Sequence, residues 1–295
     1  MTRGFLSAIL IALAANCAFA QNDQPKADTT EVTVRVIKSA KGDSVIVDAG
    51  GGKWVRVVGK PKNVSTSWWG IDLGFSNYVD NTNYSSAEAQ AYAQGSDAGY
   101  FDLRNGKSVN VNIWIFNQRV NLIKHVVNLK YALGLELNNY RYKTNIRYNN
   151  STATADVVNL DQTAGRSYKK NKLAADYVTV PVMLNFNFTP AKYKTIKAST
   201  GESKSKSISI SNKYGYGFSA GMSVGYLYSA RNKFITSDEG KQKIKDDFDL
   251  RPWKISYVGE VNLGYISLYG SYATKSMYRR GLDMTPYNVG LRFGF

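Results

Sequence analysis

Apolar and polar residues alternate along the last ten residues of the chain, 286–295. The apolar positions are Tyr287, Val289, Leu291, Phe293 and Phe295. A period of two is the period of a β-strand that has one apolar face and one polar or small face. The pattern therefore predicts a strand over 286–295.

Seven further segments share this alternation. They cover residues 68–78, 108–123, 127–138, 174–188, 215–226, 253–264 and 266–274. In the second of them, the pattern puts Trp114 and Phe116 on the same face as Asn110 and Asn112. Strands of this length exceed the usual strand of globular proteins and match what a bilayer core requires. Eight such segments predict an all-β chain that forms an eight-stranded antiparallel transmembrane β-barrel.

The predicted connections alternate in length. Three long, polar loops cover 79–107, 143–173 and 229–252, whereas the turns near Lys124 and Gly264 are tight. Long loops at one end and short turns at the other are typical of outer-membrane barrels, whose long loops face outward. The Lys- and Ser-rich stretch 189–213 departs from this rule, and we interpret it as an insertion at the turn end.

The second face of the strands decides which side faces inward. It is small and polar, and it carries charges of both signs. The charged positions are Asp72, Lys130, Glu136, Lys254, Glu260 and Arg292. A soluble barrel would turn its apolar face inward, but here the apolar face is broad and aromatic, which suits lipid. Charges inside a narrow barrel must pair, so we predict an interior ion-pair network among these six residues. The closing strand 286–295 would then direct its apolar side chains, Phe295 included, toward lipid.

The N-terminus has the pattern of an export signal. Arg3 precedes an apolar run, and Ala18-Phe19-Ala20 is a small-x-small cleavage site. Acylation at Cys17 is an alternative, although Asn16 is a poor residue to precede a lipoprotein cysteine. We predict a signal peptide over 1–20, a periplasmic N-terminal segment over 21–66 and the barrel over 67–295. The periplasmic segment includes three short β-like runs, 31–37, 44–48 and 54–58.

The net charge of +16 suggests anionic partners. Lipopolysaccharide and other outer-membrane lipids suit a barrel, and aromatic strand ends, with Trp68, Trp69 and Trp253, predict interfacial girdles. Nucleic acid is not a predicted partner, because the basic residues are scattered and the aromatic residues belong to strands. The barrel-assembly machinery and a periplasmic or secretion-system protein are the protein partners that we predict.

Catalytic chemistry has little support in the sequence. His125 is the only histidine, and the predicted tight turn keeps it away from the long loops. Acidic residues at 238–239, 246–247 and 249 have the chemistry of a Ca²⁺ site, but Lys241, Lys243, Lys245 and Arg251 lie among them. We interpret that stretch as a solvated mixed-charge loop. We predict no cofactor, no metal and no enzymatic activity.

Several segments together resemble a known family. They are Tyr177–Phe186 (YVTVPVMLNF), Gly217–Met222 (GFSAGM), Lys245–Trp253 (KDDFDLRPW), Pro286–Leu291 (PYNVGL) and a mature start at Ala27 with a run ending in Val45–Asp48 (VIVD). In order and spacing they resemble the PorT-like outer-membrane β-barrel family of Gram-negative bacteria. The resemblance implies a small outer-membrane barrel and no single function, although the named member belongs to a protein-secretion apparatus. The stretch 189–213 departs from the family pattern, which leaves a periplasmic partner in doubt.

The sequence thus predicts an integral outer-membrane protein of a Gram-negative bacterium, exported with a cleaved signal peptide. We predict a non-enzymatic membrane anchor or binding scaffold that acts through long extracellular loops. One alternative is a narrow transport pore or a secretion-apparatus component, although side chains fill most eight-stranded barrels. A second alternative, an outer-membrane hydrolase, is disfavoured by the single, misplaced histidine.

Overall fold

The computed structural model describes residues 63–149, 156–189 and 215–293, together with the backbone of five short strands outside these ranges. Phe295 and the predicted signal peptide lie outside the described residues, and so does most of the stretch 189–213. The chain divides into two compact units, residues 1–59 with 196–206 and residues 60–195 with 207–295.

The first unit contains a small antiparallel sheet. Its strands, in the order β1-β2-β3, are β1 (Val34–Ser39), β2 (Gly42–Asp48) and β3 (Trp54–Val57). These strands overlap the three short runs expected from the sequence. A separate two-stranded sheet consists of β10 (Lys192–Ile196) and β11 (Lys206–Ile210).

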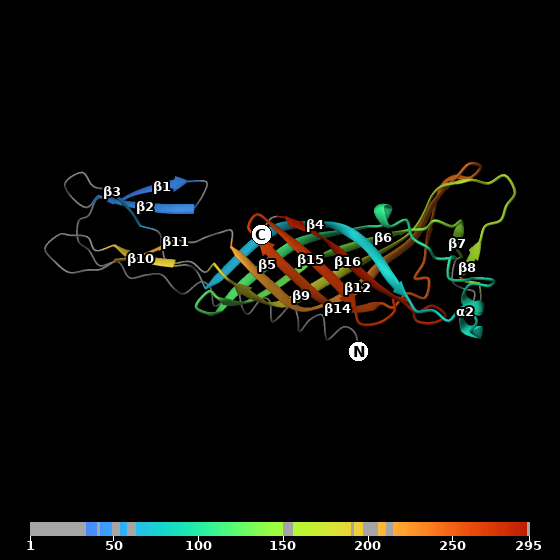
Figure 1. Cartoon of the computed structure of the whole chain (residues 1–295). Coiled ribbons are helices and arrows are strands. Elements are labelled where there is room, and N and C mark those ends of the chain that lie inside the picture. The colour runs from blue at the N-terminus through green and yellow to red at the C-terminus, as the bar shows by residue number, and fades with distance from the viewer. Residues whose placement is uncertain are drawn as a thin grey trace. The chain divides into compact units, whose positions relative to one another are not determined.

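Eight long strands of the second unit form one antiparallel sheet that closes on itself (Figure 1). They are β4 (Val64–Asp80), β5 (Val109–Ile123), β6 (Val127–Arg141), β9 (Tyr168–Asn187), β12 (Tyr216–Thr236), β14 (Trp253–Leu263), β15 (Ile266–Ala273) and β16 (Met284–Phe293). Each strand pairs with the next, and β16 pairs with β4 from Met284↔Asp80 to Phe293↔Ile71. The all-β, antiparallel class and all eight predicted segments are therefore confirmed, and the sheet is a closed ring.

Two of the ring strands are longer than the sequence pattern suggested. β9 begins at Tyr168, and β12 continues to Thr236, where it turns into β13 (Gly240–Lys245). β13 pairs with β12 from Arg231↔Lys245 to Thr236↔Gly240. The prediction of a loop over 229–252 is therefore wrong for residues 229–236 and 240–245, because backbone pairing continues through a segment that carries several charged side chains.

A β-bulge in β5 changes which side chains point inward. The register between β5 and β6 shifts between Trp114 and Phe116, and Trp69 on the neighbouring strand has a φ of 62°. Trp114 is buried in the ring, whereas the Phe116 ring packs edge-on against Trp68, which is exposed, with centroids 5.4 Å apart. The expectation that both aromatic residues share one face is wrong, because the extra residue of a bulge reverses the alternation.

The turn between β5 and β6 explains the position of the single histidine. Lys124 and His125 both have positive φ values, 46° and 60°, as the two central residues of a type I′ hairpin turn require. Asn121 Oδ1 accepts a hydrogen bond from the His125 main-chain nitrogen at 2.6 Å. The histidine therefore lies at the turn end of the ring.

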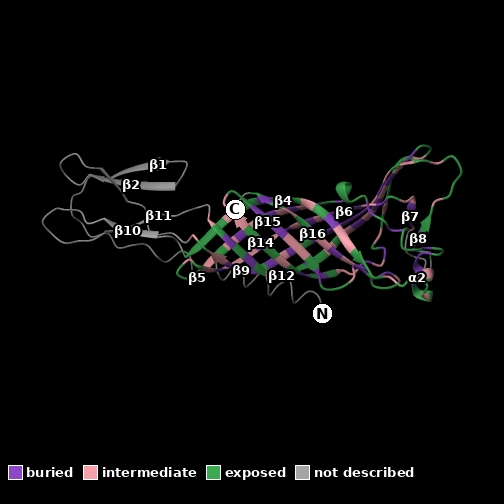
Figure 2. Ribbon diagram, in the orientation of Figure 1, coloured by how far each residue is buried: buried purple, intermediate pink, exposed green. Residues whose placement is uncertain are grey.

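The loops at the opposite end have a core of their own. Helix α2 (Ala87–Tyr92), the 3₁₀ helix η1 (Asn105–Lys107) and the short hairpin of β7 (Ile146–Tyr148) and β8 (Val158–Leu160) lie in these loops. Their buried aromatic and aliphatic side chains pack with inward residues of the ring strands. Figure 2 marks buried positions in purple both along the ring strands and in the loops at this end. The buried loop residues include Tyr92, Tyr100, Phe101, Leu103, Tyr142, Ile146, Tyr148, Phe248, Leu250, Met277 and Tyr278. The long loops, which the sequence pattern described as polar, therefore also contain a buried aromatic core.

Candidate functional site

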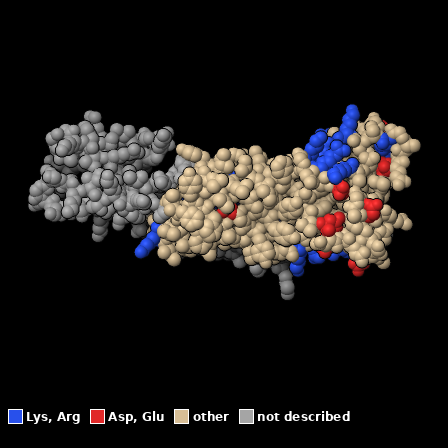
Figure 3. Space-filling model, viewed as in Figure 1, with Lys and Arg blue, Asp and Glu red and all other residues tan. Residues whose placement is uncertain are grey.

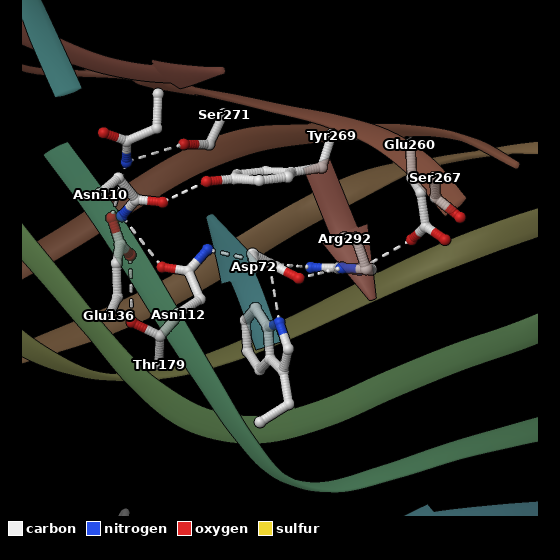
Figure 4. A network of polar contacts seen from close by, with 12 residues as sticks. Asp72, Asn110, Asn112, Glu136, Thr179, Glu260, Ser267, Tyr269, Ser271 and Arg292 are labelled. Carbon is white, nitrogen blue, oxygen red and sulfur yellow. Dashed lines mark hydrogen bonds and ion pairs between the residues drawn. The ribbon is translucent and has the colours of Figure 1, made fainter. Parts of the chain in front are cut away.

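All six charged residues singled out in the sequence have side chains inside the ring. Asp72, Glu260 and Arg292 have side-chain exposures of 0%, 1% and 7%. Glu136 and Lys254 are 7% and 9% exposed, and Lys130 is 13% exposed. The structure joins the six residues through ion pairs into two groups. Figure 4 shows polar contacts around four of them, Asp72, Glu136, Glu260 and Arg292.

The first group centres on the Arg292 guanidinium. Its Nε and one terminal nitrogen donate to both carboxylate oxygens of Asp72 at 2.7 Å each, and its other terminal nitrogen donates to Glu260 at 2.7 Å. Lys130 Nζ donates to both Glu260 oxygens at 2.8 and 2.9 Å. Two carboxylates and two cations therefore alternate in a chain that satisfies the guanidinium in the two-pronged geometry favoured by arginine.

Neutral side chains complete the coordination of Asp72. Trp114 Nε1 donates to Asp72 Oδ2 at 2.8 Å, and Asn112 donates to the same oxygen at 3.0 Å. The Arg292 guanidinium also lies over the Trp114 ring, 5.1 Å from its centroid. A buried carboxylate held by this many donors is well compensated for its loss of water.

The second group is built on Glu136. Lys254 Nζ forms an ion pair with its Oε1, and Asn138 and Asn288 donate to the same oxygen at 3.1 and 3.0 Å. Thr179 donates to Oε2 at 3.3 Å. The two groups together contain three carboxylates and three cations, and the network that they form carries no net charge.

A layer of amide side chains connects the two groups. Asn110 donates to Asn112 at 3.0 Å and to Asn138 at 2.9 Å, so it bridges the Asp72 side to the Glu136 side. Tyr269 donates from its hydroxyl to Asn110 Oδ1. The inward side chains therefore form one continuous hydrogen-bonded network across the ring.

Glycines provide the space for the large members of this network. A Cβ on Gly134 would lie 2.6 Å from the Trp114 ring, and one on Gly290 would lie 2.8 Å from the Tyr269 ring. The same Gly290 Cβ would lie 2.4 Å from the main-chain oxygen of Leu73 on the neighbouring strand. The inward face is therefore fitted to its aromatic residues, and a side chain at either glycine would displace them.

Little open space remains in the middle of the ring. A cavity of about 30 Å³ lies among Asn112, Trp114, Glu136 and Arg292. A larger polar cavity of about 320 Å³ opens near the turn end of the ring, and its lining includes Lys130, Glu260 and Arg292. The volume at the network level has room for only one or two waters.

The outward face of the ring strands is apolar and exposed. In the closing strand, Val289, Leu291 and Phe293 are 49%, 43% and 37% exposed, and Tyr287 is half-buried. The other ring strands present Ile71, Leu73, Phe75, Val178, Val182, Leu184, Phe218, Met222, Val224, Ile255, Tyr257, Val261, Leu268 and Tyr272. Soluble monomers rarely expose a continuous apolar surface of this extent.

Aromatic residues border this apolar surface at both ends. Trp68, Trp69, Phe188 and Tyr216 are exposed toward the turn end. Tyr226, Tyr228 and Trp253 are exposed toward the loop end, with Tyr226 and Trp253 paired across β12 and β14. Ten residues separate Tyr216 from Tyr226 along β12, and at a tilt near 45° they span about 23 Å.

Asp238 and Glu239 at the loop end are neutralised by arginines that lie far away in the sequence. Arg166 pairs with Asp161, Asp238 and Glu239 at 2.8, 2.7 and 3.0 Å, and Arg147 also pairs with Glu239. Burial raises the pKa of Asp161, but hydrogen bonds from Thr163, Tyr168 and Arg166 hold that pKa well below its usual range. The lysines of β13, which lie among these acidic residues in the sequence, take no part in these ion pairs.

Two further ion pairs involve the acidic residues of the third loop. Asp247 pairs with Arg279 at 3.0 Å, and Asp249 pairs with Arg280 at 2.7 Å. Among the described residues, no group of three or more histidine, cysteine, aspartate or glutamate side chains could hold a metal ion. Arg279 and Arg280 instead join the third long loop to the connection between β15 and β16.

The sequence pattern did not reveal the neutral part of the network. The asparagines at 110, 112, 138 and 288 fall on the polar face of the alternation, which was the available signal. Their function in bridging two ion-pair groups depends on which strands are neighbours across the ring, and on the bulge that turns Trp114 inward.

No helix in the described part of the chain combines the length and apolarity needed to cross a bilayer. In comparisons with known proteins, no family model and no curated protein sequence matches the chain.

Proposed function

We propose that the chain is an integral outer-membrane protein of a Gram-negative bacterium, an eight-stranded transmembrane β-barrel that acts as an anchor and binding scaffold. The observation that carries the proposal is the inversion of the ring: its outside is apolar and its inside holds a neutral, hydrogen-bonded polar network. Lipid stabilises the first surface, and internal pairing stabilises the second. The charge-poor band between the two ends of the ring is visible in Figure 3.

The folded loop end supports a scaffold rather than an open pore. Tyr148 donates or accepts hydrogen bonds with Tyr142 at 2.6 Å and with Tyr278 at 2.8 Å inside an apolar core. Loops held by such a core present a fixed surface to a partner. The narrow interior at Arg292 also disfavours general solute conduction, which is the first alternative.

The proposal includes the absence of enzymatic activity. Each of the three interior carboxylates, Asp72, Glu136 and Glu260, is held by a cation and by further donors. Such carboxylates have no free position for general acid or base chemistry. The export signal and the PorT-like resemblance stay predictions from the sequence.

The test is refolding of the mature chain into phospholipid vesicles, followed by electrophoresis with and without boiling. A membrane barrel should migrate differently in the two samples and should resist trypsin over 63–293 when it is in vesicles. Equal migration of boiled and unboiled samples, together with full digestion, would refute the barrel. Steady single-channel conductance would instead favour the pore.

A further inference from the structure

A row of four basic residues crosses four neighbouring strands at the loop end. Arg141 of β6 is the register partner of Lys172 of β9, Lys172 is the partner of Lys233 of β12, and Lys233 is the partner of Lys243 of β13. Directly opposed residues of antiparallel strands point to the same face. The four side chains therefore lie side by side on one face of the sheet.

The same face carries four more cations one step along the strands. We define the basic face as Arg141, Lys170, Lys172, Arg231, Lys233, Lys241, Lys243 and Lys245. Arg231 forms an ion pair with Asp176. Among the described residues, no carboxylate forms an ion pair with any of the other seven. Figure 3 shows basic side chains gathered at the loop end, beyond the charge-poor band.

The row is unfavourable for the protein alone. Like charges that face each other across strands repel one another and destabilise a sheet. Burial, and then the neighbouring Lys170 and Lys233, lower the pKa of Lys172 to about 8. The charge of Lys245 lowers the pKa of Lys243. A bound anion would remove this repulsion.

The basic face continues the outward apolar face of the ring. Along β9, Lys170 and Lys172 have the same alternation as Val178 and Val182, and along β12, Arg231 and Lys233 follow the exposed Tyr226 and Tyr228. At about 3.3 Å per residue and a tilt near 45°, Lys233 lies roughly 12 Å beyond Tyr228 along the ring axis. On the same geometry Arg231 lies roughly 7 Å beyond Tyr228, so the basic face begins in the polar layer directly outside a bilayer core and extends outward from it.

We propose that the basic face binds the phosphate groups of lipopolysaccharide in the outer leaflet, while the acyl chains of the same lipid lie on the adjoining apolar face. This inference rests on the proposed function, because it requires the loop end to face outward from a membrane. Charge complementarity and continuity with the apolar face both favour a phosphorylated lipid. Lysine and arginine are the usual ligands of phosphate oxygens.

The experiment measures binding of fluorescent bisphosphorylated lipid A to the mature chain in maltoside micelles. The test variant is Lys233→Gln with Lys243→Gln, and the matched control is Arg104→Gln with Lys107→Gln, which removes two exposed charges from another loop. At about 1 kcal/mol per basic residue, the test variant should bind roughly 25-fold more weakly. The control should bind as the unchanged protein does.

Two further probes identify the ligand chemistry. Dephosphorylated lipid A should bind at least tenfold more weakly than the bisphosphorylated form. Inorganic pyrophosphate should compete poorly, because it has no acyl chains; equal competition would indicate a soluble polyphosphate site and would overturn the lipid assignment. Equal weakening by the test and control variants would show that only net charge matters and would also overturn it.

Failure of this inference is distinguishable from failure of the proposed function. A chain that shows the heat-dependent migration of a barrel, but whose basic-face variant binds lipid A normally, loses only the lipid site. A chain that shows no such migration refutes the barrel, whatever it binds. The test variant should fold, because it removes repulsive charges.

Discussion

Replacing Arg292 with methionine tests the interior network most directly. The substitution removes three hydrogen bonds of 2.7 Å. It also leaves two carboxylates with one cation, Lys130, in a group that was neutral before. Removing one partner of a buried ion pair typically costs about 3–5 kcal/mol. Asp72 keeps its donors Trp114 and Asn112, and Glu260 keeps Lys130, so we expect the free energy of unfolding to fall by about 3 kcal/mol.

A second variant separates charge imbalance from lost packing. Asp72→Asn combined with Arg292→Met removes one charge of each sign and restores neutrality. Residues in direct contact couple by about 0.5–3 kcal/mol. The double variant should therefore be more stable than Arg292→Met alone, by about 1–2 kcal/mol.

The assay is equilibrium unfolding in guanidinium chloride of the chain refolded in phospholipid vesicles, followed by tryptophan fluorescence. Arg104→Met serves as the control, because Arg104 is exposed at the loop end. Ordinary surface substitutions change the free energy of unfolding by about 0.5 kcal/mol or less. A change no larger than that for Arg292→Met would refute the contribution of the network to stability. A double variant that is less stable than the single variant would refute the charge-balance argument.

Three further predictions concern other parts of the chain. Gly290→Ala should lower the unfolding free energy by about 1–3 kcal/mol in the same assay, because its Cβ would lie 2.4 Å from a main-chain oxygen, whereas Gly106→Ala, in open space, should not. Tyr148→Phe should cost about 1 kcal/mol and expose the loops to trypsin, because it removes the hydroxyl that links two buried tyrosines; unchanged cleavage would contradict this. Burial and neighbouring cations lower the pKa of Lys172 to about 8, against about 10.4 when unfolded. The unfolded chain then holds more protons between these pH values, so unfolding free energy should rise from pH 8 to 10 relative to Lys172→Met; parallel pH profiles would contradict this.

Alternation along the chain was sufficient to predict the ring strands and their inward charges. A period of two needs only local sequence, and the outward position of Val289, Leu291 and Phe293 in the closing strand followed from it. Trp114 and Phe116 show the limit of that reasoning. The bulge between them is one inserted residue, and alternation contains no signal for it. Only the structure therefore shows that Trp114 alone of the two lies inside the ring, where it donates to Asp72.

The loop end was less predictable than the strands. Residues 229–245 contain many charges, which favoured a solvated loop, yet they form paired backbone in β12 and β13. Backbone hydrogen bonds do not depend on side-chain polarity, and a strand pair that extends beyond the apolar belt needs no apolar face. The aromatic core of the loops was hidden because its members come from four separate connections.

The basic face shows why register carries functional information that composition lacks. Its central row joins Arg141, Lys172, Lys233 and Lys243, which are 31, 61 and 10 residues apart in sequence. In sequence these cations look scattered, and scattered charge argues only for solubility or general attraction to anions. Aligned by four neighbouring strands, they become a like-charge row above an apolar belt. The protein alone gains nothing from that row, whereas a lipid with a phosphorylated headgroup would be stabilised by both the row and the belt.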